Sequence, residues 1–215
     1  DIKLLGEADK VKVDLETPSI VALKPTDFHG LLPKVILKPG DKVKVGSVVF
    51  HDKYNEQVKF VSPVSGELKE IVRGEKRRIL EVRIKNDGKN EAETTEQVDP
   101  STLSGDEVKE RMLAGGLWPF LVQRPLDIIA DPAVKPKAIF ISAFDSAPLA
   151  PDYDFIVHGE DQYFQHGLNA LSKLTEGAVH LTLNGKVPAD PVFQNAKNVT
   201  INKIYGKHPA GNVGT

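Results

Sequence analysis

Cysteine is absent from this chain of 215 residues, and methionine and tryptophan occur once each. Without thiols the sequence offers no disulfide, no thiol nucleophile and no cysteine ligand for an iron–sulfur cluster. No apolar run approaches the roughly 20 residues of a membrane-spanning helix, and the first residues lack the pattern of a signal peptide. Basic residues are not in excess, with 28 Lys and Arg against 30 Asp and Glu, so no nucleic-acid partner is indicated.

Short predicted strands make up the first part of the chain. In Lys34–Phe50 and Phe60–Val72, apolar residues alternate with polar ones or follow turns, which is typical of strands with one buried face. Gly40-Asp41 and Pro63 mark turns, and the polar residues His51–Asn55 predict a hairpin tip. The spacing resembles the lipoyl and biotinyl carrier domains, which are flattened barrels of short strands.

Lys53 lies near the predicted hairpin tip, where the carrier domains have their modified lysine. One interpretation is therefore a swinging-arm attachment site. The other is an ordinary exposed lysine on a barrel without the modification, and we favour it because a fold alone does not carry a function.

Two more strands complete the predicted barrel. Ile20–Leu23 is expected at a sheet edge, and Ile79–Lys85 is expected to be the last strand. Because side chains alternate along a strand, Leu80, Val82 and Ile84 should share one face.

The acidic stretch Asn86–Pro100 is poor in apolar residues and is interpreted as a linker. The linker divides the chain into a barrel-sandwich (lipoyl-like) domain with an extended amino-terminal arm, residues 1–95, and a second domain, residues 96–215. The first domain is all-β, and the helices that follow make the whole chain a mixed α and β protein.

A helix is predicted to begin at Ser104, because Ser104 and Glu107 are spaced as a capping box in which each side chain reaches the other residue's backbone N–H. Gly115-Gly116 should end this helix, since glycine readily adopts the left-handed conformation found after a helix.

The second domain is expected to be α/β with a parallel sheet. Ala138–Phe144 is almost continuously apolar, which predicts a strand covered on both faces. A helix is predicted from Glu160 to Thr175 and strands at Val179–Leu183 and Val199–Tyr205, and strand–helix–strand at this spacing is a βαβ unit.

Loops at the carboxyl ends of parallel strands are where α/β proteins bind ligands. Asp145 and Ser146 follow the apolar strand, and His208 follows the last one. These three residues are candidate ligand or interface residues. A turn capped by Asp145 and a simple turn around His208 are the structural alternatives.

A second set of candidates follows the predicted helix, namely Gly115, Gly116, Trp118 and Arg124. Trp118 either stacks on a ligand ring or fills the gap between the two domains. The glycines do not form a dinucleotide fingerprint, because they follow a helix instead of a strand. The basic turn Arg73–Arg78 contacts an acidic partner or lipid headgroups, or is simply solvated.

Taken in order, these segments resemble the A-subunit family of the sodium-translocating NADH:quinone oxidoreductases, which is similar to the C subunit of the Rnf complex and to the flavin-carrying subunit of respiratory complex I. The resemblance is carried by Lys38–Gly46, Phe50–Lys53, Ser62–Gly66, Arg73–Arg77, Gly116–Trp118, Arg124-Pro125, Ala138–Phe140, Asp145, Phe164-Gln165, Gly167-Leu168, Leu171–Gly177, His208–Gly211 and Val213–Thr215.

The resemblance implies an amino-terminal fragment of a chain about twice this length. It also implies a peripheral subunit, without a transmembrane segment, on the cytoplasmic face of the bacterial inner membrane. Its partners would be the other subunits of a respiratory translocase that couples NADH oxidation and ubiquinone reduction to sodium ion export. NADH, flavins, iron–sulfur centres and quinone would be used on those other subunits.

The flavin-carrying relatives have a glycine-rich loop that approaches the flavin phosphate through backbone N–H groups. The matching region here is Ala114–Phe120, in which Trp118 and Pro119 occupy the space that the loop would need and Pro119 has no N–H to donate. We therefore expect no flavin here, and the absence of cysteine excludes an iron–sulfur cluster. We expect no catalytic residue, no metal and no bound cofactor in this segment, and a subunit that is structural or binds quinone. The alternative is a lipoyl- or biotin-type carrier domain fused to an α/β enzyme module.

Overall fold

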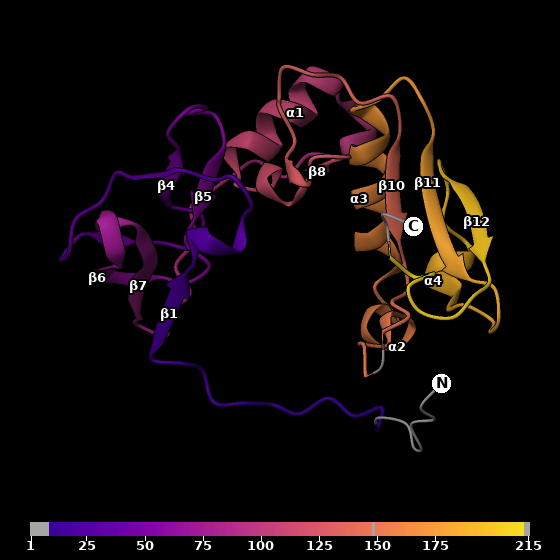
Figure 1. The fold of residues 1–215 in the computed structure, drawn as a ribbon, viewed down its shortest axis with the longest axis horizontal. Helices are drawn as coiled ribbons and strands as arrows, with labels where there is room; N and C mark the ends of the chain where they lie inside the picture. Colours follow the sequence, from indigo (N-terminus) through magenta and orange to yellow (C-terminus); the bar gives the residue numbers. More distant parts are fainter. Residues whose placement is uncertain (1–8, 148, 213–215) are drawn as a thin grey trace. The chain divides into compact units, whose positions relative to one another are not determined.

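The computed structural model describes residues 9–147 and 149–212, which divide into two compact units (Figure 1). The barrel unit contains residues 14–97 and 109–134. The sheet unit contains residues 9–13 and 98–108 and the described residues from 135 onward. Each unit has its own strands and its own buried core, so the two are described in turn.

The barrel unit is built from short antiparallel strands in two sheets, one with the order β1-β7-β6-β3 and the other with the order β2-β4-β5. The strands are β1 Ile20–Leu23, β2 Pro33–Val35, β3 Lys42–Val43, β4 Val48–Asp52, β5 Lys59–Val61, β6 Gly66–Arg73 and β7 Ile79–Asn86. β1 is an edge strand, as predicted.

Aromatic and branched side chains fill the core of the barrel unit. Phe50, Leu68 and Ile84 are fully buried. The rings of Phe50 and Phe60 stack with centroids 4.5 Å apart, and Phe28 meets Phe60 edge-on at 4.8 Å. Burial of a side chain of this size stabilises a fold by about 1.5–3 kcal/mol.

The prediction that Leu80 shares a face with Val82 and Ile84 is wrong. Ile79 is buried and Leu80 is 36% exposed, although β7 is a continuous strand. The register explains the change: Val72 pairs with Glu81 while Arg73 pairs with Ile79, so a bulge leaves Leu80 without a partner. A bulge of one residue reverses the faces on either side of it.

The predicted linker is bound to the barrel over part of its length. The Val45 N–H donates to the Glu91 carbonyl at 2.8 Å, and the Glu93 N–H donates to the Val45 carbonyl at 2.9 Å. The Ser47 hydroxyl also donates to the Glu93 carboxylate at 2.6 Å. Residues 91–93 therefore run beside the barrel as an added extended segment.

Helix α1, Gly105–Ala114, begins at the predicted capping box. The Ser104 N–H donates to the Glu107 carboxylate at 2.8 Å, and the Glu107 N–H donates to the Ser104 hydroxyl at 3.3 Å. The helix ends at Ala114 and is followed by Gly115 and by Gly116, whose φ is 70°. Both predicted ends of this helix are confirmed.

Three single-turn helices and a small hairpin connect the larger elements of the barrel unit. The single-turn helices are η1 Pro25–Asp27, η2 Glu75–Arg77 and η4 Trp118–Phe120. A fourth, η3 Pro100–Thr102, belongs to the sheet unit. The hairpin pairs β8 Val122–Gln123 with β9 Ile128–Ile129.

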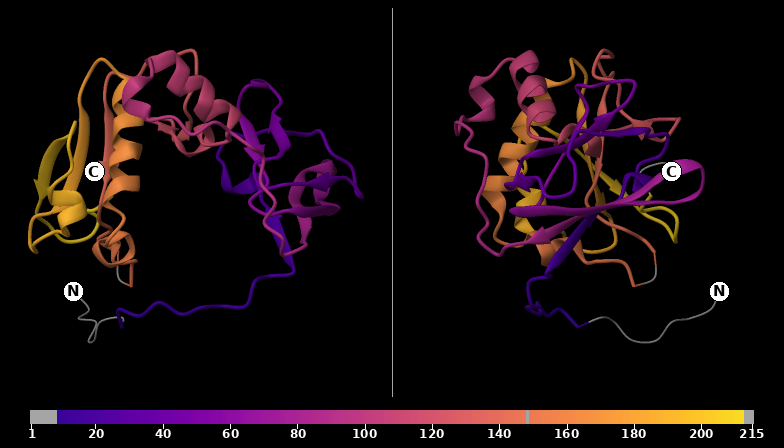
Figure 2. Two further views of the ribbon diagram at one scale, coloured as in Figure 1. Left: turned by 180° about the vertical axis from the view of Figure 1, so that it is seen from behind. Right: turned by 90° about the vertical axis from the view of Figure 1, so that its left-hand side faces the viewer.

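The sheet unit is α/β with a parallel sheet, as predicted. β11 lies between β10 and β12, and all three strands are parallel. The helix α3 runs along them, which Figure 2 shows from behind. The elements are β10 Ile139–Ser142, α2 Tyr153–Val157, α3 Asp161–Lys173, β11 Val179–Asn184, α4 Pro191–Gln194 and β12 Thr200–Ile204.

One face of this sheet carries the core of the unit. Leu181, Leu183 and Phe193 are buried there, and Phe164 of α3 meets Phe193 of α4 edge-on at 5.2 Å. The opposite face carries Phe140, which is 62% exposed. Among the described residues, β10 is therefore covered on one face only, whereas the sequence predicted cover on both.

None of the helices in the described residues is both long and apolar enough to cross a membrane.

The capping box gives the first prediction. Ser104→Ala should lower the free energy of unfolding by about 1 kcal/mol, because the Glu107 N–H loses its acceptor. Denaturant unfolding followed by the fluorescence of the single tryptophan measures this change. Ser104→Thr, which keeps the hydroxyl, should retain most of the stability, and equal midpoints for the alanine variant and the wild type would contradict the prediction.

Candidate functional site

The sheet unit brings two of its predicted site residues together at the carboxyl ends of the strands. Ser146 follows β10 and His208 follows β12, and the Ser146 hydroxyl lies 3.2 Å from the His208 ring Nδ1. The Gly211 N–H donates to the same hydroxyl at 2.8 Å. This pair is available for hydrogen bonding, but no described carboxylate orients the His208 ring as a triad would require.

Asp145 is used locally. Its carboxylate accepts from the Ala147 N–H at 2.8 Å, which forms a turn two residues long. This contact matches the structural alternative for Asp145. The side chain is exposed and is not joined to the Ser146–His208 pair.

The face of the sheet that carries Phe140, His180 and Asn202 is called the uncovered face below, because none of α2, α3 and α4 packs on it. A hollow of about 510 Å³ lies on this face. The ring of Phe140 stacks on His180 with centroids 4.9 Å apart and planes at 11°, and Asn202 Nδ2 lies 3.2 Å from His180 Nδ1. Ser142 and Gly211 line the same hollow as these three residues.

His180 and Asn202 were not among the predicted residues. Alternation along the strand places His180 on the face opposite Val179 and Leu181, but it does not show that this face is hollowed.

Gly115 and Gly116 lie in a helix-terminal motif. The Gly116 N–H donates to the Leu113 carbonyl at 3.4 Å, and the Leu117 N–H donates to the Met112 carbonyl at 2.9 Å. These two bonds define a Schellman motif. The Gly115 N–H donates to the Arg111 carbonyl at 2.8 Å, as in an α-helix. The N–H groups of Gly115, Gly116 and Leu117 therefore all have acceptors.

Trp118 and Arg124 have structural contacts in the barrel unit. Trp118 is 4% exposed, and its indole N–H donates to the Ala130 carbonyl at 2.7 Å. Arg124 is exposed, precedes a cis peptide bond and lies 3.4 Å from the Asp127 carboxylate. The predicted residues therefore form two separate groups, one in each unit.

Lys53 begins the turn between β4 and β5. Its side chain is exposed, while its backbone N–H donates to the Leu32 carbonyl at 2.8 Å. Tyr54 next to it is 78% exposed. The turn has the accessibility that a modified lysine requires, and equally that of an ordinary surface residue.

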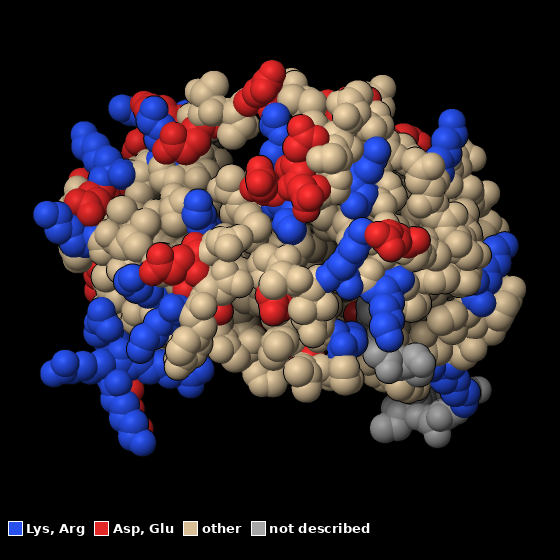
Figure 3. Space-filling view, turned by 90° about the horizontal axis from the view of Figure 1, so that it is seen from above, with Lys and Arg blue, Asp and Glu red and all other residues tan. Residues whose placement is uncertain are grey.

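The basic turn Arg73–Arg78 forms the tip of the β6–β7 hairpin, and its charged side chains are exposed. Figure 3 shows Lys and Arg side chains gathered at the end of the view that holds the barrel. Lys76 and Arg77 have positive φ values of 52° and 61°, and Arg73 Nη1 donates to the Arg77 carbonyl at 3.2 Å.

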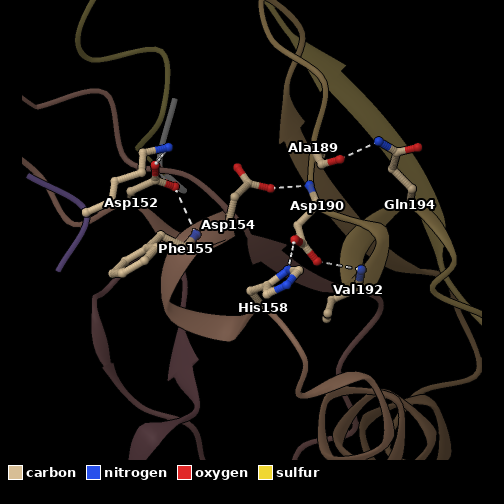
Figure 4. A network of polar contacts seen from close by, with 9 residues as sticks. Asp152, Asp154, Phe155, His158, Ala189, Asp190, Val192 and Gln194 are labelled. Carbon is tan, nitrogen blue, oxygen red and sulfur yellow. Dashed lines mark hydrogen bonds and ion pairs between the residues drawn. The ribbon is translucent and has the colours of Figure 1, made fainter. Parts of the chain in front are cut away.

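A network of carboxylates between α2 and α4 was not predicted (Figure 4). His158 Nδ1 lies 2.6 Å from the Asp190 carboxylate, which also accepts from the Val192 N–H at 2.9 Å. The Asp154 carboxylate accepts from the Asp190 N–H. Asp152 caps α2 by accepting from the Phe155 N–H at 3.2 Å.

These contacts make the network a helix-capping arrangement. The Val192 N–H and the His158 ring, in that order of importance, hold the pKa of Asp190 below its ordinary value. Across the residues that the structure describes, no group of three His, Cys, Asp or Glu side chains is placed to hold a metal ion.

Two family models match the chain. The model of the NqrA N-terminal barrel-sandwich hybrid domain matches residues 1–87, and the model of the NqrA second alpha/beta domain matches residues 103–215. The chain belongs to the NqrA family. Residues 213–215, which carry part of the resemblance seen in the sequence, lie outside the described residues.

Two curated relatives agree with this assignment, and both are named as the A subunit of the Na(+)-translocating NADH-quinone reductase. The protein of Neisseria meningitidis serogroup A is 37% identical over 218 residues, which cover 100% of this chain and 48% of the relative. The protein of Yersinia pseudotuberculosis serotype O:1b is 38% identical over 198 residues, 91% of this chain and 44% of the relative. The chain thus spans about half the length of the curated relatives it matches.

The helix-terminal motif gives a matched pair of substitutions. Gly116→Ala should lower the free energy of unfolding by about 1–3 kcal/mol, because φ is 70° there and a Cβ would lie 2.8 Å from the Val61 side chain. Gly115→Ala has no such φ and meets only the Arg111 carbonyl at 3.2 Å, so its effect should be smaller. Unfolding in denaturant measures both, and equal losses would contradict this account.

The Asp190 contacts predict a pH dependence. A lowered folded-state pKa means that the ionised Asp190 stabilises the fold above its unfolded pKa, and that this contribution is lost as pH falls through the folded pKa, below about pH 4. Asp190→Asn keeps a capping side chain but does not titrate, so its unfolding midpoint should fall less than that of the wild type between pH 6 and pH 3. Asp14→Asn, at an exposed position, is the charge control and should follow the wild type.

Proposed function

We propose that this chain is the amino-terminal half of the A subunit of a sodium-translocating NADH:quinone reductase. In this proposal the subunit is peripheral, lies at the cytoplasmic face of the inner membrane and binds the other subunits of the complex. Those subunits carry the flavins and iron–sulfur centres, and this segment has a structural role. The names of the relatives support the assignment to that complex.

One observation supports the proposal that this segment binds no flavin: the backbone N–H groups after α1 already donate to carbonyls of the helix. A phosphate cradle needs several free N–H groups that converge at the positive, amino-terminal end of a helix. Gly115, Gly116 and Leu117 instead follow the carboxyl end of α1, and their N–H groups donate to helix carbonyls. The carboxyl end of a helix carries partial negative charge, which repels an anion.

The two residues that follow the Schellman motif are not exposed to a ligand either. Trp118 and Pro119 are both buried, and a buried proline has no N–H to offer a ligand. A flavin phosphate would therefore have to unfold the end of α1 and expose Trp118 before it found donors.

Quinone binding by this subunit is the narrower part of the proposal. A quinone ring carries no phosphate, so the occupied N–H groups at residues 115–117 do not argue against it. The complex would then oxidise NADH elsewhere and reduce quinone near this chain, which contributes surface but no electron carrier.

The absent flavin is directly testable. The full-length subunit, purified alone, should be colourless and should show no binding of FMN or NADH at micromolar concentrations in calorimetry, because residues 115–117 offer no free donors. A flavin-carrying complex I subunit is the positive control. Stoichiometric tight binding of either compound would place a cofactor on this chain and overturn the proposal.

The carrier alternative is tested at Lys53. Intact-mass measurement of the native protein should show no adduct, and Lys53→Ala should leave the NADH:quinone reductase activity of the assembled complex within the error of the wild type. Lys59→Ala, on the adjacent strand β5, is the control for a nonspecific loss of charge. A lipoyl or biotinyl mass on Lys53, or loss of activity in a folded Lys53→Ala complex, would favour the carrier.

A further inference from the structure

The parallel sheet of the sheet unit has one covered face. Residues of α2, α3 and α4 pack with Leu181, Leu183 and Ala143 on that face. Sheets made only of parallel strands are as a rule covered on both faces, so the other face calls for an explanation.

The uncovered face carries a large apolar ring in the middle of a strand. Phe140 is 62% exposed and lies flat against His180, and Asn202 of β12 lies beside His180. Thr200 pairs with His180 across the sheet and is also exposed. The hollow of about 510 Å³ described above lies on this face.

The chain path explains why α3 and α4 lie on the same side of the sheet. The connections β10–α3–β11 and β11–α4–β12 both step in the same direction across the sheet. Connections between parallel strands are right-handed in about 98% of proteins. Two right-handed steps in one direction put both helices on one face, and only a step in the reverse direction puts a helix on the other face.

After β12 the chain does reverse direction. The Gly211 N–H donates to the Ser146 hydroxyl at 2.8 Å, and the Ser142 hydroxyl donates to the Gly211 carbonyl at 3.1 Å. Gly211 follows β12, whereas Ser142 and Ser146 belong to β10 and the loop after it. The chain has thus returned past β11 to the first strand of the sheet.

The outer edge of β10 is open to another strand. The Ile139 and Ala143 N–H groups donate to Ala178 and Thr182, on the β11 side. In a parallel strand, alternate residues point their N–H groups to opposite sides, so the N–H groups of Phe140 and Ser142 point away from β11. No strand pairs with this edge among the described residues.

We propose that the uncovered face of this sheet is a docking surface for the polypeptide that directly follows this segment in the full-length protein. A right-handed step from β12 past β10 lays a crossover helix over Phe140 and His180, and the next strand pairs in parallel with the open edge of β10. The relatives supply that polypeptide, because this chain spans 48% of the first of them. The proposal does not depend on the activity of the complex.

The face also indicates the chemistry of the helix. Phe140 offers an apolar contact at the centre of the surface, and His180 and Asn202 offer hydrogen bonds beside it. The docking helix should therefore be amphipathic, with an apolar stripe over the ring and a polar side chain near the imidazole.

Cysteine labelling of the full-length subunit tests the proposal. Phe140→Cys should react with a maleimide about 100-fold more slowly than Tyr163→Cys, because a covered side chain reacts only when the structure opens. Tyr163 on α3 is 80% exposed and lies outside the sheet, so it is the control. Peptide mass spectrometry separates these sites from any cysteine beyond this segment.

A second position and a measurement without substitution guard against misfolding. Thr200→Cys, on the same face, should be protected like Phe140→Cys, and the β10 amides of the unaltered full-length subunit should be protected in hydrogen exchange. Rapid labelling at both cysteine positions, together with rapid hydrogen exchange of the β10 amides, would overturn the proposal. Protection that arises only when the other subunits are added would also overturn it, because the occupant would then be a partner protein.

Discussion

The left-handed turn at Gly116 is the constraint on which the packing of Trp118 in the barrel unit depends. It ends α1, directs Trp118 into the barrel unit and brings the indole N–H to the Ala130 carbonyl at 2.7 Å. The space at this turn is filled by Val61, so a side chain larger than hydrogen does not fit without movement. In the same turn, the Gly116 and Leu117 N–H groups, which a flavin site would need, donate to helix carbonyls. One local geometry therefore accounts both for the packing of Trp118 and for the proposed absence of a cofactor.

The sheet unit is governed by a different constraint, the handedness of parallel connections. Both crossover connections lie on the side of Leu181 and Leu183, and this leaves the Phe140 side without cover from the described helices. In our proposal this second layer comes from polypeptide that follows the segment. The curated relatives leave room for it, since this chain spans 48% of the first of them.

Local signals predicted the features whose physics is local. The capping box at Ser104, the helix stop at Gly115-Gly116 and the strand predicted at Val179–Leu183 depend on neighbouring residues, and they are found where the sequence indicated. The strand predicted at Val199–Tyr205 is found at Thr200–Ile204. Features set by tertiary pairing were missed. The bulge that exposes Leu80 depends on the register of β6 against β7. The meeting of Ser146 and His208 followed from a general rule of parallel sheets, whereas the His158–Asp190 contact had no signal in the sequence.

Amide hydrogen exchange at the end of α1 tests the central claim most directly. In the full-length subunit, the Gly116 and Leu117 amides should be protected without any ligand, because they donate to Leu113 and Met112. Adding FMN at millimolar concentration should change neither their exchange rates nor their chemical shifts. Fast exchange at these two amides in the free protein, followed by protection when FMN is added, would show that the loop is a phosphate site and would contradict the account.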